Sequence, residues 1–226
     1  VAKYGADTAR LFILFAAPPE RDLNWSDQGV EGSYRFLKRV WAIVEKYLDM
    51  DNYQENTLCS DQIKLRRRLH KTIAKVTEDL DGKFNFNTAI SSIMELVNEM
   101  YSYAESHSSI AEGFKKEIVR SLLILLAPFV PHITEELWQK LGAEESSVHD
   151  AEWVVVDSSA LTVDEVELAI QVNGRVRTVM SVPIAMEKEE IEYKAKTLSA
   201  IQKFIEGKTI VKVIVVPKKI VNIVVK

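Results

Sequence analysis

Basic side chains recur at helical spacing in two stretches of the chain, where they could contact phosphate groups. Lys64, Arg68 and Lys71 follow one another at steps of four and three residues, so on a helix they would share one face. Arg35 and Arg39 stand one helical turn apart, and a guanidinium group can donate two parallel hydrogen bonds to a phosphate. Both patterns also fit a solvated helix face, and the spacing alone leaves the two interpretations open.

A second group of cations lies in the last quarter of the chain, close to two predicted turns. Its members are Arg175, Arg177, Lys208, Lys212 and Lys218. Lysines on exposed strands often have no other role than to prevent aggregation. The clustering of these cations at turns, however, favours contact with phosphates. Because Tyr193 and Phe204 are the only aromatic residues after residue 163, we expect recognition of RNA shape and backbone rather than base stacking.

The sequence holds no pattern typical of a catalytic or metal site. Its eight glycines are scattered, its four histidines lack the spacing of metal ligands, and its single cysteine excludes a multi-cysteine zinc site. Glu135 and Glu136 are adjacent, so on a helix their carboxylates diverge by about 100° and cannot flank one bond. His132 is expected to pack or to cap a helix. We therefore predict no catalytic residue, no metal site and no cofactor in this chain.

Charge is divided unevenly along the 226 residues. The net charge is −4 overall, but it is +3 from residue 163 onward and −7 before it, which suggests a polyanionic partner for the last part. No apolar run approaches the roughly 20 residues of a membrane helix, so we expect no membrane contact. A lone free thiol suits the reducing cytoplasm, and we expect a monomer. Val1 is neither a starting methionine nor part of a signal-peptide pattern, so we expect it to be a cut inside a longer polypeptide.

Helical periodicity dominates residues 6–142. Apolar residues predict a first helix over residues 6–16 that ends at Pro18 and Pro19, and Ser26 or Asp27 could cap the second. Further helices are expected up to Gly82 and over residues 86–104, 112–126 and 131–141. In the second helix one buried stripe is predicted at Val30, Tyr34, Leu37, Trp41, Val44 and Leu48. The chain is therefore predicted to be mainly α, with a connector over residues 1–25 and an antiparallel helical bundle over residues 26–142.

The pattern changes after Gly142. Residues 143–162 are polar around Trp153, and we interpret them as a linker that packs back onto the bundle; residues 51–60 are interpreted as a loop. From residue 163 apolar residues alternate with period two, and Asn173-Gly174 is typical of a hairpin turn. A helix interrupted near residues 197–199 and two more strands follow. Residues 163–226 are thus predicted to form a small β-β-α-β-β domain of the α+β class.

Two segments resemble class I aminoacyl-tRNA synthetases. The segment from Tyr4 to Phe12, YGADTARLF, resembles the one that follows the KMSKS catalytic loop of these enzymes. The segment from Leu126 to Trp138, LAPFVPHITEELW, is similar to a bundle motif shared by the leucyl, valyl, isoleucyl and methionyl enzymes. These segments indicate the class without selecting a member.

Other segments are similar to the bacterial type of leucyl-tRNA synthetase. They are residues 22–41, DLNWSDQGVEGSYRFLKRVW, together with QVNGRVR at 171–177, GKTIVKVIVVP at 207–217 and VNIV at 221–224. The resemblance covers essentially the whole chain. It implies an anticodon-binding bundle and a C-terminal domain of an enzyme that joins leucine to its tRNA. The catalytic domain with its ATP and Mg²⁺, and the editing domain, would be partners outside this chain, which is expected to be inactive alone.

The resemblance also implies roles for individual cations. Arg35 and Arg39 would lie toward the acceptor side of the tRNA, and the tail cations near its elbow. Lys218 stands where the family usually has glycine, and Val154 follows Trp153 where proline is frequent. A valyl or isoleucyl fragment, or a protein-interaction scaffold whose cations are only solvated, remain the alternatives.

Overall fold

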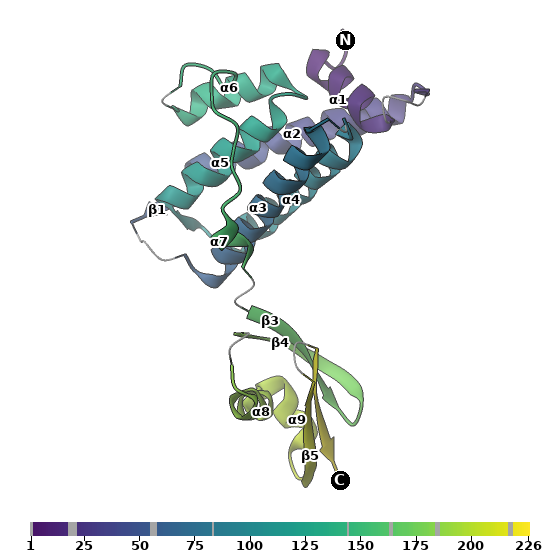
Figure 1. Cartoon of the computed structure of the whole chain (residues 1–226), viewed down its shortest axis with the longest axis vertical. Coiled ribbons are helices and arrows are strands. Elements are labelled where there is room, and N and C mark those ends of the chain that lie inside the picture. The colour runs from purple at the N-terminus through teal and green to yellow at the C-terminus, as the bar shows by residue number, and fades with distance from the viewer. Residues whose placement is uncertain are drawn as a thin grey trace. The chain divides into compact units, whose positions relative to one another are not determined.

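The chain folds into two compact units, Val1–Leu161 and Thr162–Lys226, which we call the bundle unit and the tail unit (Figure 1). The computed structural model describes residues 2–17, 22–54, 58–82, 84–143, 145–162, 165–183, 186–216 and 219–226. Pro18, Pro19 and Lys218, on which predictions were made, lie outside these ranges.

Local capping sets the ends of the helices of the bundle unit. These are α1 (Ala6–Ala16), α2 (Asp27–Asp49), α3 (Ser60–Leu80), α4 (Phe86–Ser106), α5 (Glu112–Leu126) and α6 (Pro131–Leu141). The Ser26 hydroxyl accepts a hydrogen bond from the Gly29 amide at 3.2 Å and so caps α2. Gly142 ends α6 in the left-handed region, at φ 65°, where glycine has no steric penalty. No helix within the described ranges is both long and apolar enough to cross a bilayer.

The buried face of α2 differs from the predicted stripe. Tyr34 is 36% exposed, and Trp41 and Leu48 are only half-buried. Both rings lie at the border of the core, with Lys38 Nζ 5.8 Å from the Tyr34 ring centre and Lys140 Nζ 4.4 Å from that of Trp41. The predicted stripe is confirmed at Val30, Leu37 and Val44, which are buried, and it is wrong at Tyr34. Trp41 and Leu48 pack against the core without being fully covered, and amphipathic rings often sit at such borders. The buried residues of α2 are Val30, Ser33, Phe36, Leu37, Val40, Ile43, Val44 and Tyr47.

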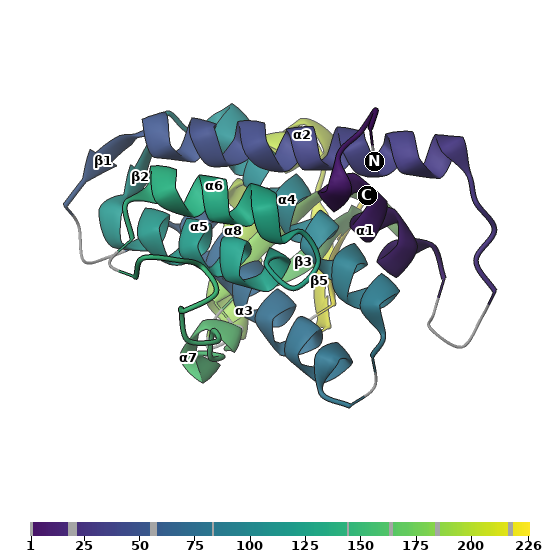
Figure 2. The same cartoon turned by 90° about the horizontal axis from the view of Figure 1, so that it is seen from above.

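Two short strands join the ends of α2 and α4. Strand β1 (Asp51–Tyr53) follows α2 and pairs in parallel with β2 (Ser109–Ala111), which follows α4 (Figure 2). Successive helices of the bundle alternate in direction, so α2 and α4 end on the same side and their following residues run the same way. The predicted loop over residues 51–60 is therefore wrong for its first three residues.

A buried lysine closes the same end of the bundle. The Lys115 ammonium donates hydrogen bonds to the carbonyl oxygens of Leu48 and Met50, each at 3.1 Å. Leu48 belongs to the last turn of α2 and Met50 is its C-cap residue, so their carbonyls have no donor within the helix. Lys115 is only 8% exposed, and its charge is favoured at the negative end of the helix dipole.

The tail unit has the predicted β-β-α-β-β order. Its elements are β3 (Glu165–Val172), β4 (Arg175–Pro183), α8 (Lys188–Thr197), α9 (Ser199–Ile205), β5 (Ile210–Val216) and β6 (Ile220–Val225). The strands form one sheet in the order β4-β3-β6-β5, in which β3 and β6 are parallel and both hairpins are antiparallel. Alternate residues of β6 are buried beneath the helices, as its period-two pattern requires.

The predicted hairpin turn has the expected backbone. Asn173 and Gly174 both have positive φ, 50° and 79°, as a type I′ turn requires. The Asn173 side chain also bonds to the backbone of Val225 in β6. Its amide nitrogen donates to the Val225 carbonyl oxygen at 3.1 Å, and its oxygen accepts from the Val225 amide nitrogen at 2.9 Å. The turn is thereby fixed to β6.

Candidate nucleic-acid interface

Arg35 and Arg39 line a groove of about 780 Å³ on the bundle unit. The groove lies among α1, α2 and α4, and apolar side chains such as Phe15 and Met94 form much of its wall. Arg35 is exposed and has no ion-pair partner among the described residues. The structure thus brings the two predicted arginines to one concave surface.

Arg39 is held by neutral partners. Its Nη2 donates to the Asn98 oxygen at 2.8 Å, and its guanidinium carbon lies 4.8 Å from the centre of the Tyr101 ring. The Tyr101 hydroxyl in turn donates to the Arg39 carbonyl at 2.9 Å. Because none of these contacts supplies a negative charge, Arg39 is positioned while its charge stays uncompensated.

The predicted basic face of α3 is largely neutralised. Arg68 contacts Glu95 at 3.0 Å and Glu99 at 3.7 Å, both on α4, and Lys64 lies 3.7 Å from Asp61. Lys71 is exposed without an ion-pair partner among the described residues. The face therefore offers a polyanion less positive charge than its sequence suggests. The acids on α4 were missed because they are remote in sequence from the cations they compensate.

The cations of the tail unit are either exposed or held by neutral groups. Arg175 and Lys212 are exposed. The Arg177 guanidinium carbon lies 4.2 Å from the centre of the Phe204 ring, and Lys208 donates to the Phe204 carbonyl at 3.2 Å. These positive charges keep their attraction for phosphate, since no carboxylate compensates them within the described part of this unit.

Arg177 sits in a β-bulge. Along the β3–β4 ladder, Ile170 is opposite Thr178 and Gln171 is opposite Val176, so Arg177 has no partner. A bulge interrupts the regular alternation of side chains. On a regular strand Arg175 and Arg177, which are two residues apart, would point to the same face of the sheet. The bulge interrupts this pattern, so the two arginines are not expected to share one face.

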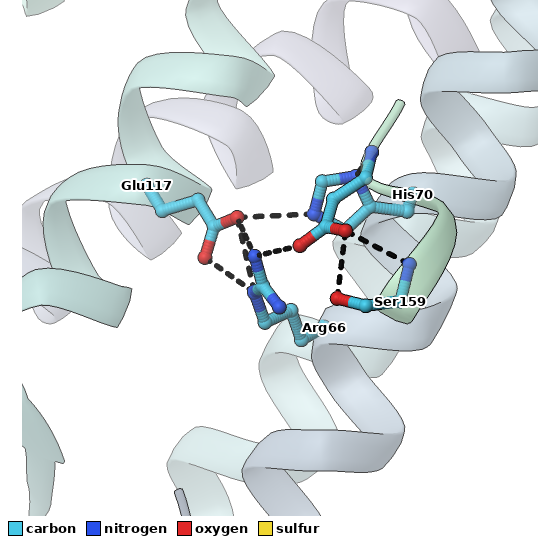
Figure 3. A network of polar contacts seen from close by, with 5 residues as sticks. Arg66, His70, Glu117 and Ser159 are labelled. Atoms are coloured by element: carbon cyan, nitrogen blue, oxygen red, sulfur yellow. Dashed lines mark hydrogen bonds and ion pairs between the residues drawn. The ribbon is translucent and has the colours of Figure 1, made fainter. Parts of the chain in front are cut away.

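A polar network that the sequence did not predict lies on α3 and α5 (Figure 3). Arg66 binds both carboxylate oxygens of Glu117, through Nε at 2.8 Å and Nη2 at 2.9 Å, and its Nη2 also contacts Asp157 at 2.9 Å. His70 Nε2 lies 3.0 Å from Glu117, and His70 Nδ1 lies 3.1 Å from the Asp157 amide nitrogen. We call Arg66, His70, Glu117 and Asp157 the clasp.

The protonation of the clasp follows from its geometry. His70 Nδ1 accepts from a backbone amide, so the ring proton is assigned to Nε2, which donates to Glu117. Burial raises the pKa of Glu117, but hydrogen bonds from His70 and Arg66 outweigh it and leave that pKa below its ordinary value. The charged groups of the clasp pair with one another inside the protein, which favours a structural role over catalysis.

His132 does not pack into the core, since its side chain is 75% exposed, and the group that caps α6 is its partner Asp7. His132 Nδ1 and the Ile133 amide each lie 2.7 Å from one oxygen of the Asp7 carboxylate. Asp7 thus accepts hydrogen bonds at the first turn of α6, where backbone donors are free. Within the described ranges no three His, Cys, Asp or Glu residues gather closely enough to hold a metal ion.

Comparison with known proteins identifies the family. Residues 62–193, more than half of the chain, match the family described as the anticodon-binding domain of tRNA ligase. Across its whole length the chain is 47% identical to leucine--tRNA ligases of Geotalea uraniireducens (strain Rf4) and Thioalkalivibrio sulfidiphilus (strain HL-EbGR7), and covers 28% of each. It is also similar to the LeuRS in the ternary complex of Agrobacterium radiobacter K84 agnB2 LeuRS-tRNA-LeuAMS. That match has a TM-score of 0.65 and 28% identity, and it covers 99% of this chain and 29% of the other. The chain therefore spans little more than a quarter of these relatives, and it belongs to the family of tRNA-ligase anticodon-binding domains.

Proposed function

We propose that this chain is the tRNA-positioning part of a leucine--tRNA ligase. The observation that carries the proposal is the 47% identity to two such ligases over the full length of the chain. The similarity to a LeuRS in a complex with tRNA supports it. Leucine would be joined to the tRNA, with ATP and Mg²⁺, in a catalytic domain outside this sequence. We further propose that catalytic and editing domains of the same polypeptide are its partners, and that it acts as a cytoplasmic monomer.

Positioning would rely on contacts to the RNA backbone. Arg35, Arg39, Arg175 and Lys212 are candidates because no carboxylate compensates them among the described residues. Such cations displace counterions from phosphates without reading sequence. Their task would be to orient the tRNA so that its 3′ end reaches an active site located elsewhere.

The other predicted cations remain candidates for phosphate contact, but they differ in how far neighbouring groups already engage them. Arg177 and Lys208 keep their charge but are partly engaged with Phe204, and Lys71 is exposed. Lys64 and Arg68 would first have to release their acids. We therefore expect the largest phosphate contribution from the groove on the bundle unit and from the tail unit.

A salt titration of RNA binding tests this function. The full chain would be titrated with leucine tRNA, with a leucine tRNA lacking its long variable arm, and with valine tRNA. We expect salt-sensitive binding that prefers the intact leucine tRNA, because phosphate contacts weaken steeply with ionic strength. Equal affinity for all three would favour a nonspecific RNA holder, and preference for valine tRNA a related synthetase. Absence of binding at low salt would favour a protein-interaction scaffold.

A further inference from the structure

The segment that leads from the bundle to the tail unit is fastened along its length to the bundle. At its start, the Trp138 indole donates to the Glu145 carbonyl at 2.9 Å. Glu135 then accepts hydrogen bonds from the Ser147 hydroxyl at 2.8 Å and the Val148 amide at 3.0 Å. We call residues 145–161 the strap, because these contacts anchor the segment to the bundle, whereas a flexible linker would have no such anchors.

Apolar contacts continue the attachment through the middle of the strap. Val148 is 3% exposed within the bundle core, and Val154 and Val156 pack against the same core. The Trp153 indole donates to the Thr77 hydroxyl at 2.9 Å. The strap therefore has polar and apolar anchors before it reaches the clasp.

The clasp fastens the last part of the strap. Arg66 donates to Glu117 through Nε and Nη2, and its Nη2 donates to the Asp157 carboxylate as well. His70 Nδ1 accepts a hydrogen bond from the Asp157 backbone amide. Asp157 additionally accepts from the Ser159 amide at 2.8 Å and hydroxyl at 2.7 Å (Figure 3). It thus starts the single turn α7 (Ser158–Leu161). Through Asp157, the bundle holds the residues directly before the tail unit.

We propose that the clasp is a positioning element for RNA binding, because it keeps the tether between the units short. About three residues separate α7 from β3, and they can span at most about 11 Å. Release of residues 157–161, which follow the apolar anchors, would add about five residues, or roughly 18 Å of reach. The proposal rests on the proposed function, in which both units contact one tRNA.

The expected size of the effect follows from tether length. Effective concentration falls as about the −3/2 power of the length of a flexible tether, so lengthening it from about three to about eight residues lowers that concentration about fourfold. Partial release would lower it less. The guanidinium of Arg66 is already paired with the Glu117 carboxylate, so loss of Asp157 should leave the salt slope of RNA binding unchanged.

The test replaces Asp157 with Asn in the full chain. Asp157→Glu serves as the conservative rescue, and Glu45→Gln as the matched control, because Glu45 pairs with Lys140 away from the strap and its side chain is 42% exposed against 38% for Asp157. One label can be attached to the exposed Cys59, the only cysteine of the chain, and the second to a Glu190→Cys variant in the tail unit. The distance distribution between the labels then reports the tether without RNA.

We expect Asp157→Asn to broaden the label distribution, to speed amide exchange in residues 157–161, and to raise the Kd for leucine tRNA about two- to fourfold at unchanged salt slope. Glu45→Gln should behave as wild type, and Asp157→Glu should restore part of each effect. An unchanged distribution in Asp157→Asn would overturn the clasp, and a broadened distribution with unchanged Kd would overturn its role in RNA binding. Failure of the wild-type chain to bind would instead refute the proposed function, and with it the RNA part of this proposal.

Discussion

Charged side chains serve different ends in the two units. In the bundle unit acids and bases pair across helices, as Arg66 does with Glu117 and Arg68 with Glu95. In the tail unit no ion pair joins two described residues, although this part of the sequence carries both signs. Net charge by region is therefore an incomplete guide to polyanion binding, because only cations without a nearby acid contribute their full charge.

The clasp should be the most sensitive charged site of the bundle unit. We expect Glu117→Ala to lower the free energy of unfolding by about 2 kcal/mol, because it leaves His70 and Arg66 without their shared acceptor in a half-buried site. Urea denaturation followed by helical circular dichroism measures this. Glu95→Ala, whose side chain is 61% exposed, should change stability by less than about 0.5 kcal/mol. Equal losses in the two variants would contradict the distinction.

Two neighbouring lysines of the bundle unit allow a second comparison. Lys115→Met removes the donor to two carbonyls at the end of α2, and we expect a loss of about 1–2 kcal/mol. Lys116, 69% exposed and paired with Glu112 one turn away, provides the matched control Lys116→Met, with an expected change below about 0.5 kcal/mol. Thermal unfolding of both variants checks this, and a similar Tm for the two would refute the assigned role of Lys115.

Cations of the two units should differ in RNA binding. We expect the double variant Arg175→Gln/Lys212→Gln to weaken binding of leucine tRNA several-fold and to reduce the salt slope by roughly one for each phosphate interaction that the substitutions remove. Arg68→Gln should change both quantities little, because Glu95 and Glu99 already compensate its charge. A larger effect of Arg68→Gln would show that α4 releases this arginine to RNA.

Acid should loosen the strap at low pH. Hydrogen bonds from Ser159, and then the Arg66 guanidinium, hold the pKa of Asp157 well below its usual range. A carboxyl with a depressed pKa stabilises the fold above its unfolded value of about 4, and this contribution is lost as the pH falls through the folded pKa.

Amide exchange, corrected for intrinsic rates, measures this loosening. We expect residues 153–161 to stay protected at pH 4.5 and to lose protection progressively toward pH 2.5. The strands of the tail unit should lose less protection over the same pH range, since no ion pair joins described residues there. Equal acid sensitivity in both units would contradict the contrast between them.

Local patterns were sufficient to predict most elements. The N-cap of α2, the proline that begins α6 and the Asn173-Gly174 turn act within a few residues, so the sequence alone places them. The alternation from residue 165 onward likewise predicted the β-β-α-β-β order. It did not predict the strand order β4-β3-β6-β5, because pairing between remote strands depends on side chains that periodicity does not compare.

The polar contacts that the sequence did not predict join residues that are far apart along the chain. Arg66 and His70 resemble members of a basic helix face in sequence, yet their acids lie 51 and 47 residues away. Lys115 was not singled out, since the carbonyls that it binds are more than 60 residues earlier. A helix pattern indicates which residues share a face, but it does not indicate which neighbouring helix supplies their partners.

The parallel pairing of β1 with β2 has a consequence for how the protein folds. The paired residues Asp51 and Ser109 are separated by two full helices, α3 and α4. Closing so long a loop for a three-residue ladder is entropically unfavourable until those helices have packed together. The pair therefore forms late, and hydrogen exchange at Asp51, whose amide donates to the Ser108 carbonyl, reports the moment at which the bundle has reached its native topology.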